Sequence, residues 1–147
     1  MPDLHWIDNA VIYAIYPLGM LGAPGADDFS AAPVHRFRGL LDWTDHWRSL
    51  GVNTIALGPI FESTRHGYDT ADYFHLDRRL GTCEESAGLC AELHARGFRI
   101  LLDGVFNHVG RDFWAFRDLR SHPQGSPYQN WFAGFQLGRQ SPRGDPF

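Results

Sequence analysis

The segment "GFRILLDGVFNHVG", residues 97–110, joins an apolar run to three polar side chains, Asp103, Asn107 and His108. An Asp-Gly pair between apolar residues is typical of a type I′ hairpin turn, so "LLDGVF" taken alone favours two antiparallel strands. A helical pattern, however, ends at Gly97 and leads directly into the run, as in the helix-to-strand connections of α/β proteins. We therefore predict one parallel strand with Asp103 at its carboxyl end and the other two polar residues in the next loop. Ligands of α/β folds bind at that edge.

Two earlier apolar runs resemble the run at 98–106: "VIYAIYP" at residues 11–17 and "NTIALGPI" at residues 53–60. None of the three alternates with polar residues, which predicts strands buried on both faces, as in parallel sheets. Apolar residues at three-to-four spacing predict a helix over residues 40–50 and a second helix that begins after residue 82. The order strand, helix, strand, helix, strand predicts an α/β fold with a parallel sheet and right-handed crossovers.

The predicted helix ends carry recognisable signals. Gly51 and Gly97 follow the two helices, where a left-handed backbone conformation favours glycine. Thr82 and Glu85 form a T-x-x-E capping box at the start of the second helix. These signals fix the helices independently of the apolar pattern.

Residues 107–147 show no further strand pattern. A short helix is predicted over residues 112–119, and the chain ends in a loop-like "SPRGDPF". Three strands and two helices rarely close a core, so we expect apolar surface to stay uncovered and the chain to self-associate.

Composition limits the partners of the chain. Its 147 residues suffice for one domain, and the net charge of −4 with scattered basic residues excludes a nucleic-acid or membrane-surface footprint. No apolar run is long enough to span a bilayer, and the N-terminus lacks a secretion signal. Cys83 and Cys90 lie seven residues apart on a predicted helix, about 10 Å along its axis, too far for a disulfide. Two free thiols favour a cytoplasmic location.

The stretch after the second predicted strand places Tyr68, Asp69, Asp72 and Tyr73 around Gly67. An aromatic ring can stack on the apolar face of a sugar while carboxylates accept bonds from its hydroxyls. Aspartate and tyrosine in loops also cap turns and cover core edges, so a purely structural role stays open. A single loop histidine such as the one at position 108 has the same two interpretations.

A metal site is a further hypothesis for Asp103, Asn107 and His108, because oxygen and imidazole ligands suit a divalent transition metal. The sequence has no H-x-x-x-H and no cysteine pair at ligand spacing, which disfavours a dedicated zinc site. Motifs for a serine nucleophile elbow, a Walker loop or a dinucleotide fingerprint are also missing. A small α/β metal-binding domain remains one alternative.

Taken together, "VIYAIYP", "LGVNTIALGPIFES", "HGYDTADYFHLDRRLGT" and "DGVFNH" resemble, in that order, the start of the catalytic barrel of the α-amylase family of glycoside hydrolases. The tail "SPYQNWFAGFQLGRQSPRGDPF" is most similar to cyclomaltodextrinase- or neopullulanase-type members. The resemblance implies an incomplete TIM (β/α)₈ barrel with the first three strands and two helices. Residues 1–106 would form the N-terminal part of the barrel, and residues 107–147 would begin the long insertion after the third strand.

The resemblance also implies roles for individual residues. Tyr68 would stack on the sugar at the cleavage subsite, and His108 would hydrogen-bond the same sugar. Asp103 would orient an arginine on the fourth strand. Asn107 matches a residue that binds calcium in many α-amylases, although the other ligands would come from sequence that this chain lacks. Asp69 and Asp72 would shape their loop.

The family hydrolyses or transfers α-glucosidic bonds of starch-like glucans with retention, through two carboxyl groups about 5 Å apart. In the family these carboxylates follow the fourth and fifth strands, so the resemblance assigns no catalytic residue to this chain. We expect it to be inactive alone, to bind an α-glucan or maltooligosaccharide, and to need no cofactor. A non-catalytic carbohydrate-binding protein built from a truncated barrel is the other alternative.

Overall fold

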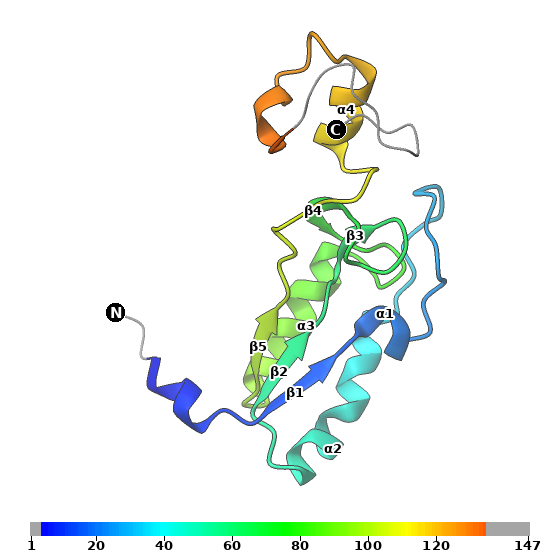
Figure 1. Ribbon diagram of the computed structural model, residues 1–147. Helices are drawn as coiled ribbons and strands as arrows, with labels where there is room; N and C mark the ends of the chain where they lie inside the picture. The colour runs from blue at the N-terminus through cyan, green and yellow to red at the C-terminus, as the bar shows by residue number, and fades with distance from the viewer. Residues whose placement is uncertain (1–3, 135–147) are drawn as a thin grey trace.

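A three-stranded parallel sheet forms the centre of the molecule (Figure 1). The computed structural model describes residues 4–134. Strands β1 (Ile12–Ile15), β2 (Thr54–Leu57) and β5 (Arg99–Leu102) lie side by side in the order β1-β2-β5. All three pair in parallel, so the predicted α/β fold with a parallel sheet is confirmed.

The Asp-Gly pair after β5 does not turn the chain back into a hairpin. The backbone N–H of Asp103 donates to the carbonyl of Leu57 at 3.0 Å, which extends the parallel ladder by one residue. The type I′ hairpin interpretation of "LLDGVF" is therefore wrong. Glycine at position 104 instead begins the loop that leaves the carboxyl edge of the sheet.

Helices connect the three parallel strands. The segment η2 (Phe37–Trp43) is a 3₁₀ helix that continues into α2 (Thr44–Ser49), and α3 (Cys83–Ala95) precedes β5. The helix predicted over residues 40–50 is thus present, with its first turns in the narrower 3₁₀ form. Both predicted helix ends also carry glycine in the left-handed region, with φ of 74° at Gly51 and 88° at Gly97.

The capping box at the start of α3 is confirmed. The hydroxyl of Thr82 accepts from the backbone N–H of Glu85 at 3.3 Å, and the Glu85 carboxylate accepts from the backbone N–H of Thr82 at 2.9 Å. The same carboxylate lies 2.7 Å from Nδ1 of His35. Glu85 therefore joins the helix start to the segment that precedes η2.

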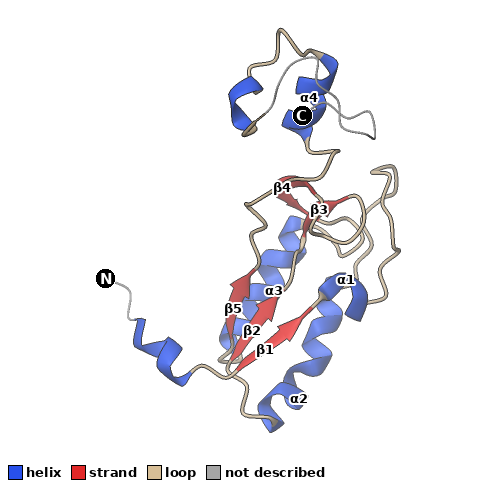
Figure 2. Ribbon diagram, viewed as in Figure 1, coloured by secondary structure: helices blue, strands red, loops and turns tan. Residues whose placement is uncertain are grey.

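The segment between β2 and α3 contains a hairpin that the sequence pattern did not predict. Strands β3 (Phe61–Ser63) and β4 (Thr70–Leu76) pair antiparallel, with irregular register at Glu62. The hairpin stands above the carboxyl edge of the parallel sheet (Figure 2). The remaining helical elements of the described chain are η1 (Leu4–Asn9), α1 (Pro17–Met20), α4 (Trp114–Ser121) and η3 (Gln129–Trp131).

The parallel sheet is covered on one side. Side chains of Ile15, Ile55 and Leu57 mark what we call the closed face, which packs against η2, α2 and α3. Ala14, Ala56 and Leu101 mark the opposite, open face, and α3 passes behind the sheet on the closed side (Figures 1 and 2). The buried core consists of Ile15, Leu18, Phe37, Leu40, Trp47, Val52, Ile55, Leu57, Ile60, Leu76, Leu80, Leu89, Leu93 and Phe98.

The prediction that all three strands are buried on both faces is wrong for β1 and β5. Ile12 and Leu102 are each 50% exposed, and Leu101 is 37% exposed. Both strands lie at the edges of the sheet, and among residues 4–134 the helices η2, α2 and α3 pack on the closed face, while Trp6 of η1 contacts Arg99 at the amino end of the open face. Only the central strand β2 has the burial that the apolar runs predicted.

A buried ion pair anchors the hairpin. Asp77 and Arg79 are almost fully buried, with Nη2 of Arg79 2.6 Å from the Asp77 carboxylate and 2.8 Å from the hydroxyl of Ser63. The guanidinium also donates to the carbonyls of Pro24 and Arg65, at 3.0 and 2.7 Å. The pair therefore ties three separate loops together, and all of its hydrogen-bonding groups are used.

The state of the two cysteines and the lengths of the helices can be compared with the predictions from the sequence. Cys83 and Cys90 are both free, as predicted. None of the helices in residues 4–134 is long and apolar enough to cross a membrane. The predicted helix at 112–119 corresponds to α4, whereas the boundary at residue 106 stays a prediction and "SPRGDPF" lies outside the described residues.

Candidate functional site

A cavity of about 540 Å³ lies at the carboxyl edge of the parallel sheet, on the open face. Alanines and Leu101 form its apolar floor, and Tyr68 and Asp103 contribute polar groups to it. The two residues come from segments that are far apart in the sequence. The described residues that line it are Ala14, Ile15, Tyr16, Ala56, Leu57, Gly58, Tyr68, Leu101, Leu102 and Asp103.

Tyr68 reaches the cavity from the turn between β3 and β4. The turn needs glycine at position 67, because φ is 85° and a Cβ there would lie 2.8 Å from the side chain of Pro59. The backbone N–H of Gly67 donates to the hydroxyl of Ser63 at 3.1 Å. Tyr68 itself is 45% exposed, so one part of its ring is held by the turn and another faces solvent.

Asp69 and Asp72 act inside the hairpin, as expected for loop-shaping residues. The Asp69 carboxylate accepts from the backbone N–H of His66 at 3.1 Å. The Asp72 carboxylate accepts from the backbone N–H of Phe74 at 2.8 Å and lies 3.0 Å from Nδ1 of His75. Neither residue lines the cavity at the sheet edge.

Asp103 is half-buried at the end of β5, less buried than expected for an acid inside a closed barrel. Its backbone continues the sheet, but its carboxylate makes no hydrogen bond or ion pair with any residue of the described chain. A carboxylate in this state can accept bonds from a ligand or from a cationic side chain. Its proposed arginine partner remains a prediction.

His108 contacts the backbone of Tyr68. Its Nε2 lies 2.9 Å from the Tyr68 carbonyl oxygen, and since a carbonyl only accepts, Nε2 carries the proton of this bond. Nδ1 lies 3.4 Å from Nδ2 of Asn107. His108 thus contacts the turn between β3 and β4 directly, whereas Asn107 contacts His108. The sugar contact expected for His108 stays a prediction.

Calcium is not supported by the residues around Asn107. Calcium takes six to eight oxygen ligands, usually several of them carboxylates. Within residues 4–134, no group of three or more His, Cys, Asp or Glu side chains is arranged to hold a metal ion. The Asn107 amide faces His108 instead, so we derive no role for a metal from this site.

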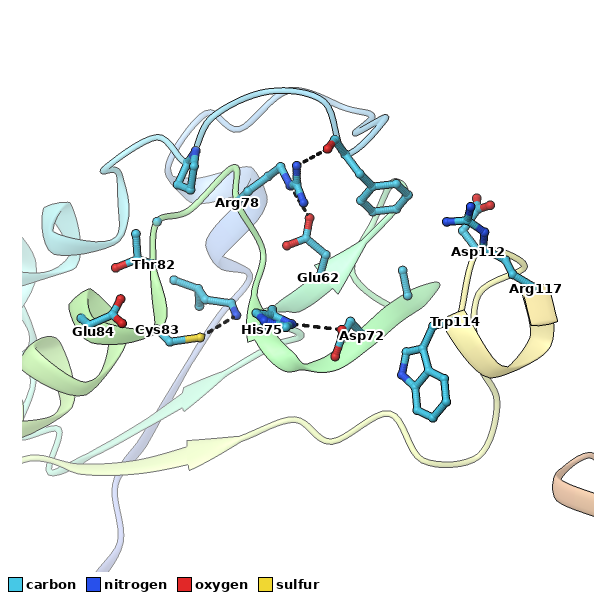
Figure 3. A pocket seen from close by; sticks show the side chains of 15 residues that line it. Glu62, Asp72, His75, Arg78, Thr82, Cys83, Glu84, Asp112, Trp114 and Arg117 are labelled. Atoms are coloured by element: carbon cyan, nitrogen blue, oxygen red, sulfur yellow. Dashed lines mark hydrogen bonds and ion pairs between the residues drawn. The ribbon is translucent and has the colours of Figure 1, made fainter. Parts of the chain in front are cut away.

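A second cavity of about 540 Å³ lies between the β3–β4 hairpin, the start of α3 and the start of α4 (Figure 3). Four of its polar side chains form two pairs: His75 bonds Asp72, and Nε of Arg78 lies 2.7 Å from the Glu62 carboxylate. Burial raises the pKa of Glu62, although Arg78 opposes the shift. Because these four groups bond one another, we treat this cavity as a weaker candidate than the first.

Comparison with known proteins decides the family. A family model described as "Alpha amylase, catalytic domain" matches residues 30–145. The chain belongs to the α-amylase catalytic-domain family. A cyclomaltodextrinase from a Bacillus species is 36% identical over 141 residues, and neopullulanase 2 from Thermoactinomyces vulgaris is 37% identical over 143 residues. The resemblance to cyclomaltodextrinases and neopullulanases is therefore confirmed.

The matches cover most of this α-amylase-family chain but a small part of the relatives. They include 86% and 87% of this chain and 25% and 24% of the two relatives, so the chain spans about a quarter of their length. The structure of a cyclic alpha-maltosyl-(1→6)-maltose hydrolase from Arthrobacter globiformis matches 93% of this chain and 36% of its own, with a TM-score of 0.73 and 35% identity. The family fold is a TIM barrel, of which the three described parallel strands form an open part.

Proposed function

We propose that this chain provides part of the sugar-binding wall of an enzyme that hydrolyses or transfers α-glucosidic bonds of starch-like glucans. The observation that carries the proposal is the cavity that brings Tyr68 and Asp103 together at the carboxyl edge of the sheet. One structural neighbour, the Arthrobacter globiformis hydrolase, is also known in complex with cyclic alpha-maltosyl-(1→6)-maltose. A maltooligosaccharide is therefore the proposed ligand.

The chemistry of the cavity suits a sugar. The apolar floor and the exposed part of the Tyr68 ring offer surfaces for the C–H face of a pyranose ring. The carboxylate of Asp103, which has no hydrogen-bond or ion-pair partner within residues 4–134, offers an acceptor, either for a sugar hydroxyl or for an arginine that it orients. A few polar groups around an apolar surface are the usual composition of a small-ligand pocket.

The proposal assigns no catalytic carboxylate to this chain. Retaining hydrolysis needs a nucleophile and a general acid about 5 Å apart. Within the described residues, Asp103 is the one acid among those that line the cavity. A single carboxylate cannot perform both steps, so we propose that the isolated chain binds glucan without cleaving it.

We further propose a cytoplasmic location. Cys83 and Cys90 are free, and burial raises the pKa of the Cys90 thiol, which keeps it in the less reactive neutral form. One relative, from Bacillus subtilis, is named intracellular maltogenic amylase and is 35% identical over 145 residues. Fractionation of the producing cells tests the location, and recovery outside the cytosol contradicts it.

Equilibrium dialysis with maltoheptaose tests the function. The unsubstituted chain is expected to bind, and Tyr68→Ala should weaken binding by roughly 1–3 kcal/mol because a stacking surface is lost. Phe74→Ala is the matched control, since this aromatic residue is 80% exposed on β4 and does not line the cavity. Reducing-sugar release should stay at background in every sample.

Two outcomes of this experiment contradict the proposal. Equal binding by the unsubstituted chain, Tyr68→Ala and Phe74→Ala would show that the assigned cavity does not bind maltoheptaose. Release of reducing sugar that a point substitution abolishes requires a catalytic acid within the chain. The proposal that the chain binds glucan without cleaving it is then wrong.

A further inference from the structure

The loop that carries His108 is fastened to the β3–β4 hairpin by one tyrosine hydroxyl. Oη of Tyr73 bonds the carbonyl of Val105 and lies 3.2 Å from the carbonyl of His108. A phenol has one proton, and both partners are acceptors, so the two bonds share that proton. The hydroxyl thus holds the two sides of the tip of the loop over residues 103–110.

The ring of Tyr73 is fixed where it can make these bonds. Its centroid lies 5.9 Å from that of Phe61, 5.6 Å from Phe106 and 5.8 Å from Phe113. The three neighbours come from β3, from the loop itself and from the start of α4. Aromatic contacts on several sides restrict the ring, so the hydroxyl is held in position before any ligand binds.

Two further contacts join the same loop to the β3–β4 hairpin, one of them at the turn that carries Tyr68. The backbone N–H of Gly110 donates to the carbonyl of Thr70 at 2.8 Å, and a Cβ at position 110 would run into the carbonyl of Asp69. His108 donates to the carbonyl of Tyr68 at 2.9 Å. The loop after β5 and the turn that presents Tyr68 therefore pack as one unit.

We propose that Tyr73 is a positioning residue for the sugar site. Its hydroxyl holds the 103–110 loop, the loop places His108, and His108 holds the Tyr68 carbonyl so that the ring stays at the cavity. Tyr73 does not line the cavity and acts through the other two residues. This inference rests on the proposed function, because it assigns Tyr68 to sugar binding.

Hydrogen exchange measured by mass spectrometry, combined with maltoheptaose dialysis, tests the proposal on the full chain. Tyr73→Phe removes the hydroxyl and keeps the ring. Tyr13→Phe is the matched control, since the Tyr13 hydroxyl makes no hydrogen bond within residues 4–134 while its ring packs on His46 and Trp47. Gly110→Ala disturbs the loop contact from its other end.

Tyr73→Phe and Gly110→Ala should both speed exchange in peptides over residues 103–110 and leave α3 and β2 unchanged. Both should weaken maltoheptaose binding by about three- to tenfold, the range expected for one lost hydrogen bond. Tyr13→Phe should change neither. A merely structural role would instead speed exchange throughout the chain.

The possible failures are separable. Unchanged loop exchange and binding in both Tyr73→Phe and Gly110→Ala overturn the positioning role, and if Tyr73→Phe does not fold, the Gly110→Ala comparison decides alone. Faster loop exchange in Tyr73→Phe and Gly110→Ala, together with an unsubstituted chain that binds no maltoheptaose, overturns the proposed function but supports the loop contact. Faster exchange over residues 103–110 in Tyr73→Phe with unchanged maltoheptaose binding shows that Tyr73 does not position the site.

Discussion

Both faces of the parallel sheet carry apolar residues, but the two faces have different surroundings. On the closed face, Ile55 and Leu57 are buried to within 1% against η2, α2 and α3. On the open face, Leu101 is 37% exposed and forms part of the floor of the cavity. Apolar residues on both sides of a strand predict that both faces of the sheet are buried. Among residues 4–134, the closed face is buried and the open face is not.

The difference also explains where the candidate site lies. A closed (β/α)₈ barrel fills its interior with side chains from all eight strands, and its active site lies at the carboxyl ends of the strands. With three strands described, the inner side is open and the cavity reaches down to Ala14 and Ala56. The helix-covered face supplies stability, whereas the open face supplies the site.

The sharpest test of the two-face comparison uses one type of substitution on each face. Leu93 is fully buried on α3 beneath the closed face, so Leu93→Ala should cost about 2–5 kcal/mol of unfolding free energy by leaving a cavity. Leu101→Ala should cost less than about 1 kcal/mol, since little of its environment is packed. Urea unfolding measures both costs, with the two variants compared at equal protein concentration.

Equal costs at the two positions would contradict the comparison. A large loss for Leu101→Ala would mean that the open face is covered in solution, for example by a second copy of the chain. The protein concentration is therefore varied in the same experiment, because a covered interface makes the unfolding midpoint depend on concentration.

The second prediction concerns contact of the open face with a second copy of the chain. β5 has no strand neighbour on its outer side among residues 4–134, and such an edge pairs readily with another chain. We propose that the chain self-associates through this edge and the open face. Leu101→Lys should shift the elution in size-exclusion chromatography toward the monomer, because an edge lysine opposes strand addition.

Leu50→Lys is the matched control for this prediction. Leu50 is 54% exposed at the end of α2, away from the open face. An equal shift from both lysines would indicate a general effect of added charge. A monomeric unsubstituted chain would remove the self-association proposal.

Local signals account for the parts of the fold that could be predicted. The three apolar runs, the capping box at Thr82 and the glycines after both helices each act within a few residues, so the sequence carries them explicitly. The order of these elements then fixes the parallel sheet and the carboxyl edge. Asp103 and Tyr68 could be assigned to that edge before their contacts were known.

The parts that could not be predicted depend on distant contacts. β3 and β4 have mixed burial and an irregular register, so no clean alternation marks them. Asp77 and Arg79 resemble surface charges in "HLDRRLGT", and only the loops folded around them bury the pair. Tyr73 belongs to the tyrosine- and aspartate-rich stretch around Gly67, but the role proposed for it depends on the carbonyls of Val105 and His108, which a sequence pattern does not show.

The smallest predicted effect concerns the capping of α3, the helix that packs on the closed face. Glu85 caps α3, and the hydrogen bond with His35 holds the pKa of this carboxyl below its usual value, against the opposing effect of burial. Because the folded state lowers this pKa, Glu85 contributes stability above the unfolded value of about 4.3, and the contribution disappears as the pH falls through the folded pKa. Glu85→Gln should therefore lower the unfolding free energy by up to about 1 kcal/mol at pH 6, a surface-pair magnitude. Urea midpoints of the variant and the unsubstituted chain should converge as the pH falls through the folded pKa of Glu85. A difference that grows on acidification would show that the charge of Glu85 does not support the helix.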